Sequence, residues 1–253
     1  MIIGNGMIAR RFSINFSDND RVVVFASGVS NSSSTDHNSF LREETMLAHC
    51  LEEHGDKTLV YFGTCSIFDT MLQHSAYILH KKKMEMLIRT RWPAYLICRT
   101  TNIIGKTENP HTLVNHLYQR ILAGREVEVW TSAQRNLLDI DDLHMVVSEL
   151  LPRVLHAQTT VNVFHPRWLT ISEIIVAIEN HLGIPASCRY VSKGNKYEIP
   201  DDHNIALMFS RLGIYSSSNY FSLMLNKYYL PIISSSQHEP IEKNTSSSKM
   251  PAD

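Results

Sequence analysis

A short apolar segment, a glycine-containing turn and an apolar helical pattern stand together at the start of the chain, and they constrain its fold strongly. Ile2 and Ile3 precede the turn Gly4-Asn-Gly6-Met-Ile-Ala9. The glycines permit a tight turn from a strand into a helix, and a small third residue lets that helix pack closely on the strand. Strands are predicted at 1–4, 22–26, 58–64 and 95–100, and helices at 6–16, 39–54, 71–91 and 110–124. Such alternation predicts an α/β fold with a doubly wound, mostly parallel sheet.

The same turn carries a pattern typical of dinucleotide binding. Gly6 lets a pyrophosphate approach the backbone, and the unpaired amides of the helix N-terminus face it. Alone, this pattern is a weak signal, because a plain strand-to-helix connection can share it. The predicted cofactor contacts from this turn are Gly4, Gly6, Met7, Ile8 and Ala9.

Three side chains further along predict acid–base chemistry. Thr64 ends the apolar run 58–64, and Tyr77 and Lys81 are four residues apart, which places them on one helix face. A phenol titrates near pKa ~10, and reaching roughly 7 takes about 4 kcal/mol of phenolate stabilisation. One close, partly desolvated cation supplies energy of that order. We expect Tyr77 to protonate a carbonyl oxygen as hydride reaches its carbon, with Thr64 hydrogen-bonded to that oxygen. The alternative is a half-buried tyrosine beside a solvated lysine run.

In this order, the motifs resemble the extended short-chain dehydrogenase/reductases of the NAD-dependent epimerase/dehydratase type, which act largely on nucleotide sugars. The resemblance runs from Met1 to about Tyr229. It implies a Rossmann-like core, NAD or NADP as cofactor, and further cofactor contacts from Tyr77 and Lys81. The loop Ala26-Ser27-Gly28 resembles the family's small-residue loop beside the nicotinamide ribose.

Two later segments extend the resemblance to a substrate. Residues 99–105, Arg-Thr-Thr-Asn-Ile-Ile-Gly, resemble the segment that closes the family's sixth strand. Residues 135–143 resemble the segment in which an arginine meets the diphosphate of a sugar nucleotide. The resemblance therefore implies that Asn102 and Arg135 bind a nucleotide-sugar substrate.

The chain departs from the family pattern after the first helix. A Rossmann half places an acid at the end of its second strand, where it holds the adenosine ribose. Asp18 and Asp20 precede the strand at 22–26, so neither occupies that position. This strand is either the second strand without its acid or the family's fourth strand. We favour the fourth, because the helix at 39–54 leads directly to the strand that ends at Thr64. The cofactor-binding half is then shortened, and the choice between NAD and NADP stays open.

The residues after Thr64 narrow the expected reaction. The family's 4,6-dehydratases place Asp-Glu there, whereas this chain has Cys65 and Ser66. Residues 63–68 resemble a segment of GDP-fucose synthase, whose epimerising cysteine corresponds to Ser66, and a serine is a poor base unaided. We expect NAD(P)-dependent reduction of a keto-sugar nucleotide for surface glycan precursors. A nucleotide-sugar 4-epimerase using the same tyrosine and lysine, and a non-catalytic nucleotide-binding relative, stay as alternatives.

The element pattern also suggests how the chain is divided. Residues 1–105 and 137–165 are expected to form the dinucleotide-binding core. Residues 106–136 and 166–230 are expected to form a small C-terminal substrate lobe over the ends of the strands. Residues 231–253 are rich in serine and poor in apolar side chains, which predicts a disordered tail.

Composition excludes several other function classes. With 24 basic and 25 acidic residues, no global field points to nucleic acid or membrane. Thirteen histidines form no paired ligand spacing, so no metal site is predicted. No signal peptide or long apolar run is evident, which indicates a cytoplasmic protein, with a homodimer as one option for its assembly. The four cysteines show no paired spacing and are expected to be reduced: Cys50, Cys65, Cys98 and Cys188.

Overall fold

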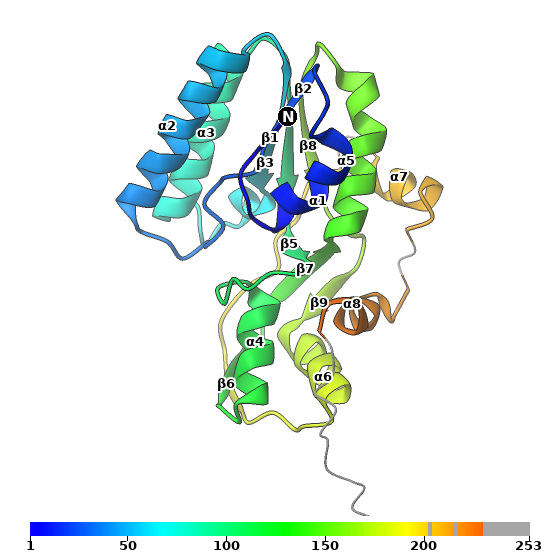
Figure 1. Ribbon diagram of the computed structural model, residues 1–253. Helices are drawn as coiled ribbons and strands as arrows, with labels where there is room; N and C mark the ends of the chain where they lie inside the picture. Colours follow the sequence, from blue (N-terminus) through cyan, green and yellow to red (C-terminus); the bar gives the residue numbers. More distant parts are fainter. Residues whose placement is uncertain (202–203, 215–216, 230–253) are drawn as a thin grey trace, which may run out of the picture.

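The structure, a computed structural model, describes residues 1–201, 204–214 and 217–229. Its larger part is a five-stranded parallel sheet in the order β1-β2-β3-β4-β8. Helices α2 and α3 cover one face, and α1 and α5 cover the other (Figure 1). The predicted α/β fold with a parallel, doubly wound sheet is confirmed. The elements of this core are β1 (Ile2–Ile3), α1 (Met7–Phe16), β2 (Val22–Phe25), α2 (His37–His54), β3 (Thr58–Thr64), α3 (Ala76–Arg91), β4 (Tyr95–Thr100), α5 (Ile140–Val154) and β8 (Gln158–Val163).

Alternation along the central strands explains the two helical layers. Successive side chains of a strand point to opposite faces. In β2, Val22 and Val24 belong to the cluster that contains α1 and α5, whereas Val23 and Phe25 belong to the cluster under α2 and α3. All four residues of β2 are buried, as expected for a strand with helices on both faces.

The position of β1 identifies the missing part of the fold. β1 pairs with β2 through Ile2 and Ile3, and no other strand among the described residues pairs with it. In the full Rossmann order 3-2-1-4-5-6, the first strand lies between the second and the fourth. Here β2 lies between β1 and β3, so β2 occupies the place of the fourth strand. The predicted direct passage from the first to the fourth strand is confirmed.

Side-chain caps set where the two long outer helices begin. Asp36 accepts hydrogen bonds from the amides of Asn38 and Ser39, so α2 begins at His37. Ser75 accepts one from the amide of Ile78, so α3 begins at Ala76, not at residue 71 as predicted. The preceding residues form a 3₁₀ turn, η1 (Cys65–Phe68), and further turns around the buried Asp69.

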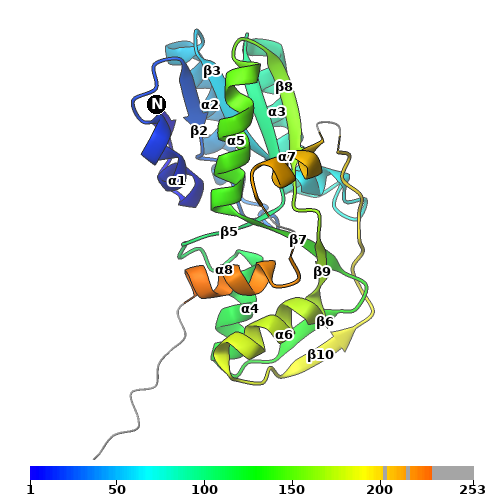
Figure 2. The same cartoon turned by 90° about the vertical axis from the view of Figure 1, so that its right-hand side faces the viewer.

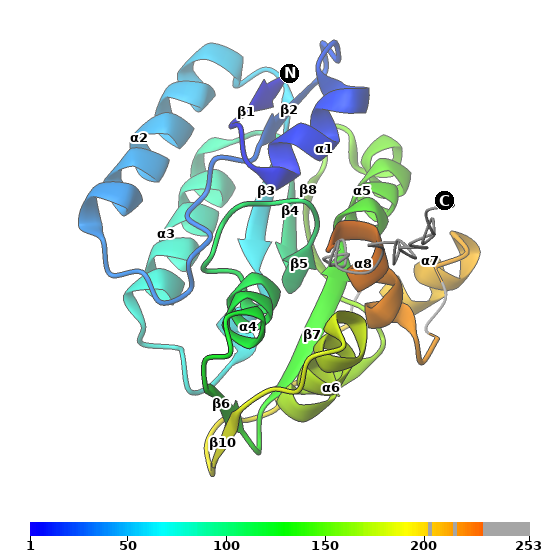
Figure 3. The same cartoon turned by 60° about the horizontal axis from the view of Figure 1, so that its bottom comes forward.

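The smaller part is a lobe beyond the C-terminal ends of the strands (Figures 1 and 2). Its apolar side chains form a separate cluster from Ile104 to Leu225. β7 runs between the two parts, from β6 and β10 to the start of α5 (Figure 3). The lobe contains β5 (Asn102–Ile104), α4 (Leu113–Leu122), β6 (Val127–Trp130), β7 (Gln134–Asp139), β9 (Trp168–Thr170), α6 (Ile171–Leu182), β10 (Cys188–Val191) and α8 (Tyr220–Tyr228).

Strand β5 and helix α7 (Ile205–Arg211) differ from the expected division, because β5, expected in the core, pairs with β7 outside the core sheet. Sequence order assigned residues 205–211 to the lobe, but Ile205, Met208 and Phe209 pack in the cluster that includes α1 and α5. Their apolar contacts lie with the sheet, because the chain after β10 returns alongside β8 (Figure 2). The predicted tail, 231–253, lies outside the described residues.

Polar contacts fasten the last described helix to the core. Tyr228 donates a hydrogen bond to Asp139 at 2.6 Å, and Lys227 lies 2.8 Å from the other oxygen of that carboxylate. Tyr220 donates to Asp142 and also accepts from the amide of Asp139. Asp139 caps α5, so these bonds join α8 to the start of a core helix. Within the described residues, no helix is long and apolar enough to cross a membrane.

Candidate active site

A cavity of about 970 Å³ lies where the C-terminal ends of the strands meet the lobe. Parallel α/β sheets bind ligands at this edge. Three of the expected site residues do not line it: Gly4, Ala9 and Ser27, the last of which contacts Arg42 of α2 through its carbonyl and hydroxyl. The expected residues that do line it are Gly6, Met7, Ile8, Ala26, Gly28, Thr64, Tyr77, Lys81, Asn102 and Arg135.

The turn between β1 and α1 fits a pyrophosphate. Gly4 has φ +120°, and a Cβ there would lie 2.5 Å from the carbonyl oxygen of Ala26. Gly6 begins α1 without a side-chain cap, and a Cβ there would meet no atom within 4 Å. The open space at Gly6 faces the first turn of a helix, where backbone amides attract an anion. Ala9 is buried and serves the close packing of the helix on the strand.

The core side of the cavity lining has no acidic side chain among the described residues. The carboxylates that line the cavity are Glu126 and Glu128, and both belong to the lobe. Asp18 and Asp20 precede β2 and do not line it. The absence of a ribose-binding acid among the lining residues follows from the strand order, because the second strand of a Rossmann half normally supplies it.

Thr64, Tyr77 and Lys81 all line this cavity. Tyr77 and Lys81 lie one turn apart on α3, and the Lys81 ammonium is 6.0 Å from the centre of the Tyr77 ring. Both residues are buried except where they reach the cavity. The hydroxyl of Thr64, at the end of β3, accepts a hydrogen bond from the amide of Ser66 at 3.1 Å. The structure therefore brings the three predicted residues together.

Glu43 of α2 is the main partner of Lys81, and sequence reasoning missed it. One carboxylate oxygen of Glu43 lies 2.9 Å from the Lys81 ammonium and 2.7 Å from the hydroxyl of Tyr61. The other oxygen accepts from the amide of Val29 at 2.6 Å and lies 2.9 Å from Nε2 of His80. An ionised carboxylate only accepts, so that histidine nitrogen carries a proton. Glu43 lies on α2 and Lys81 on α3, and their contact depends on how these two helices pack, which the sequence does not show.

Glu43 is ionised although it is completely buried. Burial alone would raise the pKa of its carboxyl. The charge of Lys81 and the hydrogen bonds from His80, Val29 and Tyr61 outweigh burial and lower this pKa to about 2. Burial and the neighbouring Glu43 raise the pKa of Tyr61 well above its usual value, so Tyr61 stays a neutral donor.

Gly28 packs closely against this pair of charges. A Cβ at Gly28 would lie 2.7 Å from the Lys81 nitrogen and 3.0 Å from Oε1 of Glu43. The loop after β2 therefore rests directly on the buried ion pair. The family resemblance predicted that Gly28 lies beside the cofactor, and its close approach to the ion pair is a separate reason for a glycine.

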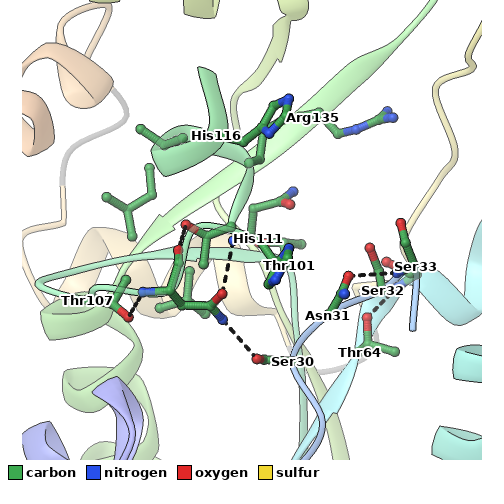
Figure 4. A pocket seen from close by; sticks show the side chains of 18 of the residues that line it. Ser30, Asn31, Ser32, Ser33, Thr64, Thr101, Thr107, His111, His116 and Arg135 are labelled. Atoms are coloured by element: carbon green, nitrogen blue, oxygen red, sulfur yellow. Dashed lines mark hydrogen bonds between the residues drawn. The ribbon is translucent and has the colours of Figure 1, made fainter. Parts of the chain in front are cut away.

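The far side of the cavity is polar and belongs to the lobe. Asn102 donates its amide to the carbonyl of Asn136 at 2.9 Å, and Arg135 donates to the carbonyl of Gln134 at 2.9 Å. Figure 4 shows Arg135 and His116 across the cavity from Thr64. Asn109 donates to Ser30 at 3.2 Å, which links the loop before α4 to the loop after β2 (Figure 4).

The residues after Thr64 differ in their access to the cavity. Cys65 is fully buried, its thiol lies 3.2 Å from the carbonyl of Arg99, and burial raises the pKa of that thiol. Ser66 lines the cavity, and Tyr197 is hydrogen-bonded to it. Burial raises the pKa of Tyr197 to about 12, so it is a neutral phenol. Cys65 therefore supplies no thiolate base to the cavity.

Other lining residues had no sequence signal of their own. They lie in the loops after β2 and β5, on α4, on the short lobe strands β6 and β10, and directly after α8. Among the described residues, no three His, Cys, Asp or Glu side chains gather as metal ligands. The lining residues that sequence reasoning did not single out include Ser30, Asn31, Ser32, Ser33, Thr107, His111, His116, Arg120, Glu128, Trp130, Arg189 and Tyr229.

The sequence itself matches one known family. The profile described as "NAD dependent epimerase/dehydratase family" matches residues 9–163, which is more than half of the chain. The chain therefore belongs to the NAD-dependent epimerase/dehydratase family. No curated protein matches the sequence.

Solved structures of this type share the fold. The chain is 15% identical to a dTDP-4-dehydrorhamnose reductase from Clostridium acetobutylicum, with a TM-score of 0.67 over 88% of this chain and 96% of that one. The same enzyme from Bacillus anthracis, in complex with NADP, gives 15% identity and a TM-score of 0.66 over 90% and 97% of the two chains. A Thermus thermophilus UDP-glucose 4-epimerase in complex with NAD gives 13% identity and a TM-score of 0.59 over 85% and 79%.

Proposed function

We propose that this member of the NAD-dependent epimerase/dehydratase family reduces a keto-sugar nucleotide with NADH or NADPH, using Tyr77 as the general acid. One observation carries the proposal. A cavity of about 970 Å³ contains the phosphate turn at Gly6, the group Thr64, Tyr77 and Lys81, and the polar pair Asn102 and Arg135. Cofactor, reacting carbonyl and sugar-nucleotide diphosphate would each meet suitable side chains there.

The residues at the core end of the cavity suit a nicotinamide dinucleotide. The first amides of α1, at Met7 and Ile8, would hold the pyrophosphate beside Gly6. Lys81 and the loop at Gly28 would flank the nicotinamide ribose. Bound NADH or NADPH would supply the hydride. The strand order removes the usual acid for the adenosine ribose, so we expect weak discrimination between the two cofactors.

Tyr77 and Thr64 would act on the carbonyl oxygen. The hydroxyl of Thr64 accepts its hydrogen bond from Ser66, so its own proton is available to a substrate oxygen. Tyr77 would donate its proton to the same oxygen as negative charge develops there. Lys81, 6.0 Å from the ring of Tyr77, would stabilise the phenolate that remains.

Arg135 and Asn102 would hold the substrate at the lobe end. A guanidinium can donate two parallel hydrogen bonds to a diphosphate, and one of its nitrogens is already oriented by the carbonyl of Gln134. Asn102 is held by the backbone of Asn136 at the start of β5. Both residues come from strands, which position a ligand more exactly than loops do.

The test is turnover with a panel of 4-keto-sugar nucleotides. Purified protein with NADH or NADPH should show loss of nicotinamide absorbance for at least one substrate, and Tyr77→Phe should abolish it. Interconversion of 4-epimers with no net cofactor oxidation would instead support the 4-epimerase. Binding of a sugar nucleotide without turnover of any kind would support the non-catalytic relative.

We further propose a role in surface glycan precursor synthesis in the cytoplasm. This role follows from the family's substrates, because a fold alone does not name a pathway. Deleting the gene should change the sugar composition of the surface polysaccharide. An unchanged composition would contradict the role, and turnover of simple ketones but of no sugar nucleotide would exclude it.

A further inference from the structure

We propose that Glu43 is a positioning residue that holds Lys81 and the loop after β2 in the arrangement the reaction needs. Glu43 does not reach the cavity and would act only through these two groups, so the inference rests on the proposed function. Its carboxylate contacts Lys81, Val29, Tyr61 and His80, which come from α3, the loop after β2, β3 and α3.

Stability alone does not explain this buried ion pair. Replacing such a pair by apolar side chains of similar volume is often neutral or stabilising, because burial costs both ions their hydration. Here Lys81 is a lining residue of the cavity, whereas Glu43 is fully buried and does not line it. The carboxylate therefore stabilises the positive charge of Lys81 next to the cavity, where burial removes the hydration that would otherwise do so.

Glu43 also couples the lysine to the cofactor loop. The amide of Val29 and the ammonium of Lys81 bind different oxygens of one carboxylate, so neither can move without the other. Gly28 packs against both members of the pair. Phe40 of α2 stacks on His80, with ring centres 4.6 Å apart, which holds the fourth partner in place.

An amide cannot replace this carboxylate. All four neighbours of Glu43 are donors, two on each oxygen. In one orientation, a glutamine would turn its NH₂ toward the amide of Val29, and in the other toward the ammonium of Lys81. The amide of Val29 cannot become an acceptor, and Lys81 can accept only after it loses its proton. Glu43→Gln should therefore release either the loop or the lysine.

The charged groups around Lys81 determine whether replacing Glu43 makes this lysine easier or harder to deprotonate. Glu43 faces it from α2, Tyr61 from β3, and Tyr77 and His80 from α3. Glu85, nearby on α3, is already paired with Arg99 of β4 at 2.6 Å. Glu43 is thus the negative charge in contact with the ammonium, and its removal makes both the ammonium and the phenol easier to deprotonate.

The chain offers a matched control. Glu44, the next residue of α2, pairs with Lys83 of α3 at 2.7 Å, but its side chain is 32% exposed and that of Lys83 is 59% exposed. Glu43→Gln and Glu44→Gln therefore remove the same charge from neighbouring α2–α3 pairs, one behind the cavity and one in solvent.

The first readout needs no catalysis. Trace acetylation with acetic anhydride at pH 8, followed by peptide mass spectrometry, reports the reactivity of each lysine. In Glu43→Gln, Lys81 should react at least about tenfold faster, the change expected for one pH unit. The Kd for NADH should also rise about tenfold, because a charge-assisted contact to the loop is lost. In Glu44→Gln, both quantities should stay within about twofold of the wild type.

The second readout is the pH profile of reduction. The alkaline limb of kcat/KM should move to lower pH by at least about one unit in Glu43→Gln and stay in place in Glu44→Gln. A purely structural role would lower only the melting temperature. If folded Glu43→Gln keeps the acetylation rate of Lys81, the Kd for NADH and the pH limb of the wild type, the inference is overturned.

A second variant keeps the test decisive if Glu43→Gln does not fold. Gly28→Ala keeps every charge, and the nearest atoms to its methyl group belong to the side chains of Lys81 and Glu43 and not to the backbone, so it should fold while the ion pair shifts. Lys81 should react faster in this variant, and an unchanged rate would count against the inference. If the wild type reduces no keto-sugar nucleotide, the proposed function fails, while acetylation and NADH binding still decide the role of Glu43.

Discussion

Two glycines in the β1–α1 turn should respond in opposite ways to an added side chain. Gly6 has φ −73°, and a Cβ there would meet no atom within 4 Å. Gly6→Val should therefore change the free energy of unfolding by less than about 0.5 kcal/mol. Its side chain would instead occupy the space that we assign to the pyrophosphate.

The expected loss of affinity follows from the contacts at the helix start. Hydrogen bonds to a charged group contribute about 1.5–3 kcal/mol each, and the amides of Met7 and Ile8 would supply two. Losing both corresponds to a rise in the Kd for NADH or NADPH of roughly 10²- to 10⁴-fold. The nucleotide-sugar end of the cavity is distant, so affinity for the substrate should be unaffected.

Gly4→Ala is the matched control for folding. Gly4 has φ +120°, and its added methyl would lie 2.5 Å from the backbone oxygen of Ala26. Such backbone strain costs about 1–3 kcal/mol before the clash is counted. A loss of that size lowers the melting temperature by roughly 2–12 °C in a domain of this length.

Calorimetric titration with NADH and NADPH, together with thermal unfolding, separates the two effects. Normal cofactor affinity in Gly6→Val would show that the turn is only a strand-to-helix connection. A wild-type melting temperature in Gly4→Ala would refute the left-handed turn and its contact with Ala26.

The remaining predictions concern chemistry, substrate and pH. Tyr77→Phe should lower kcat by about 10²- to 10⁴-fold in steady-state assays and leave the calorimetric Kd for NADH near that of the wild type; unchanged kinetics would remove Tyr77 from the mechanism. Arg135→Ala should raise the KM for the sugar nucleotide far more than the KM for the cofactor, and the reverse order would contradict the assignment of the lobe. Burial raises the pKa of Asp142 from 3.8 to about 6. The folded state then binds more protons between these values, so this group's contribution to stability falls as pH rises from about 4 to about 6. Asp142→Asn should flatten that part of the curve of melting temperature against pH, and an unchanged slope would exclude Asp142 as its source.

Local sequence was sufficient for the core elements and for part of the site. Short continuous apolar runs indicated β2, β3 and β4, and the spacing of four placed Tyr77 and Lys81 on one helix face. The direct passage from the first to the fourth strand was also readable, because the loop and helix before the Thr64 strand have their own patterns. These features depend on neighbours in the chain.

Tertiary structure alone decided the partners of the site. Glu43 and Lys81 are 38 residues apart, and no pattern along the chain shows that α2 and α3 bring them to 2.9 Å. The docking of α7 on the core and the bonds from Tyr228 and Lys227 to Asp139 have the same origin. Periodicity determines which face of an element is apolar, whereas long-range packing determines which buried charges meet across two elements. The sequence therefore predicted part of the cavity lining, including Tyr77 and Lys81, and only the fold showed the carboxylate behind them.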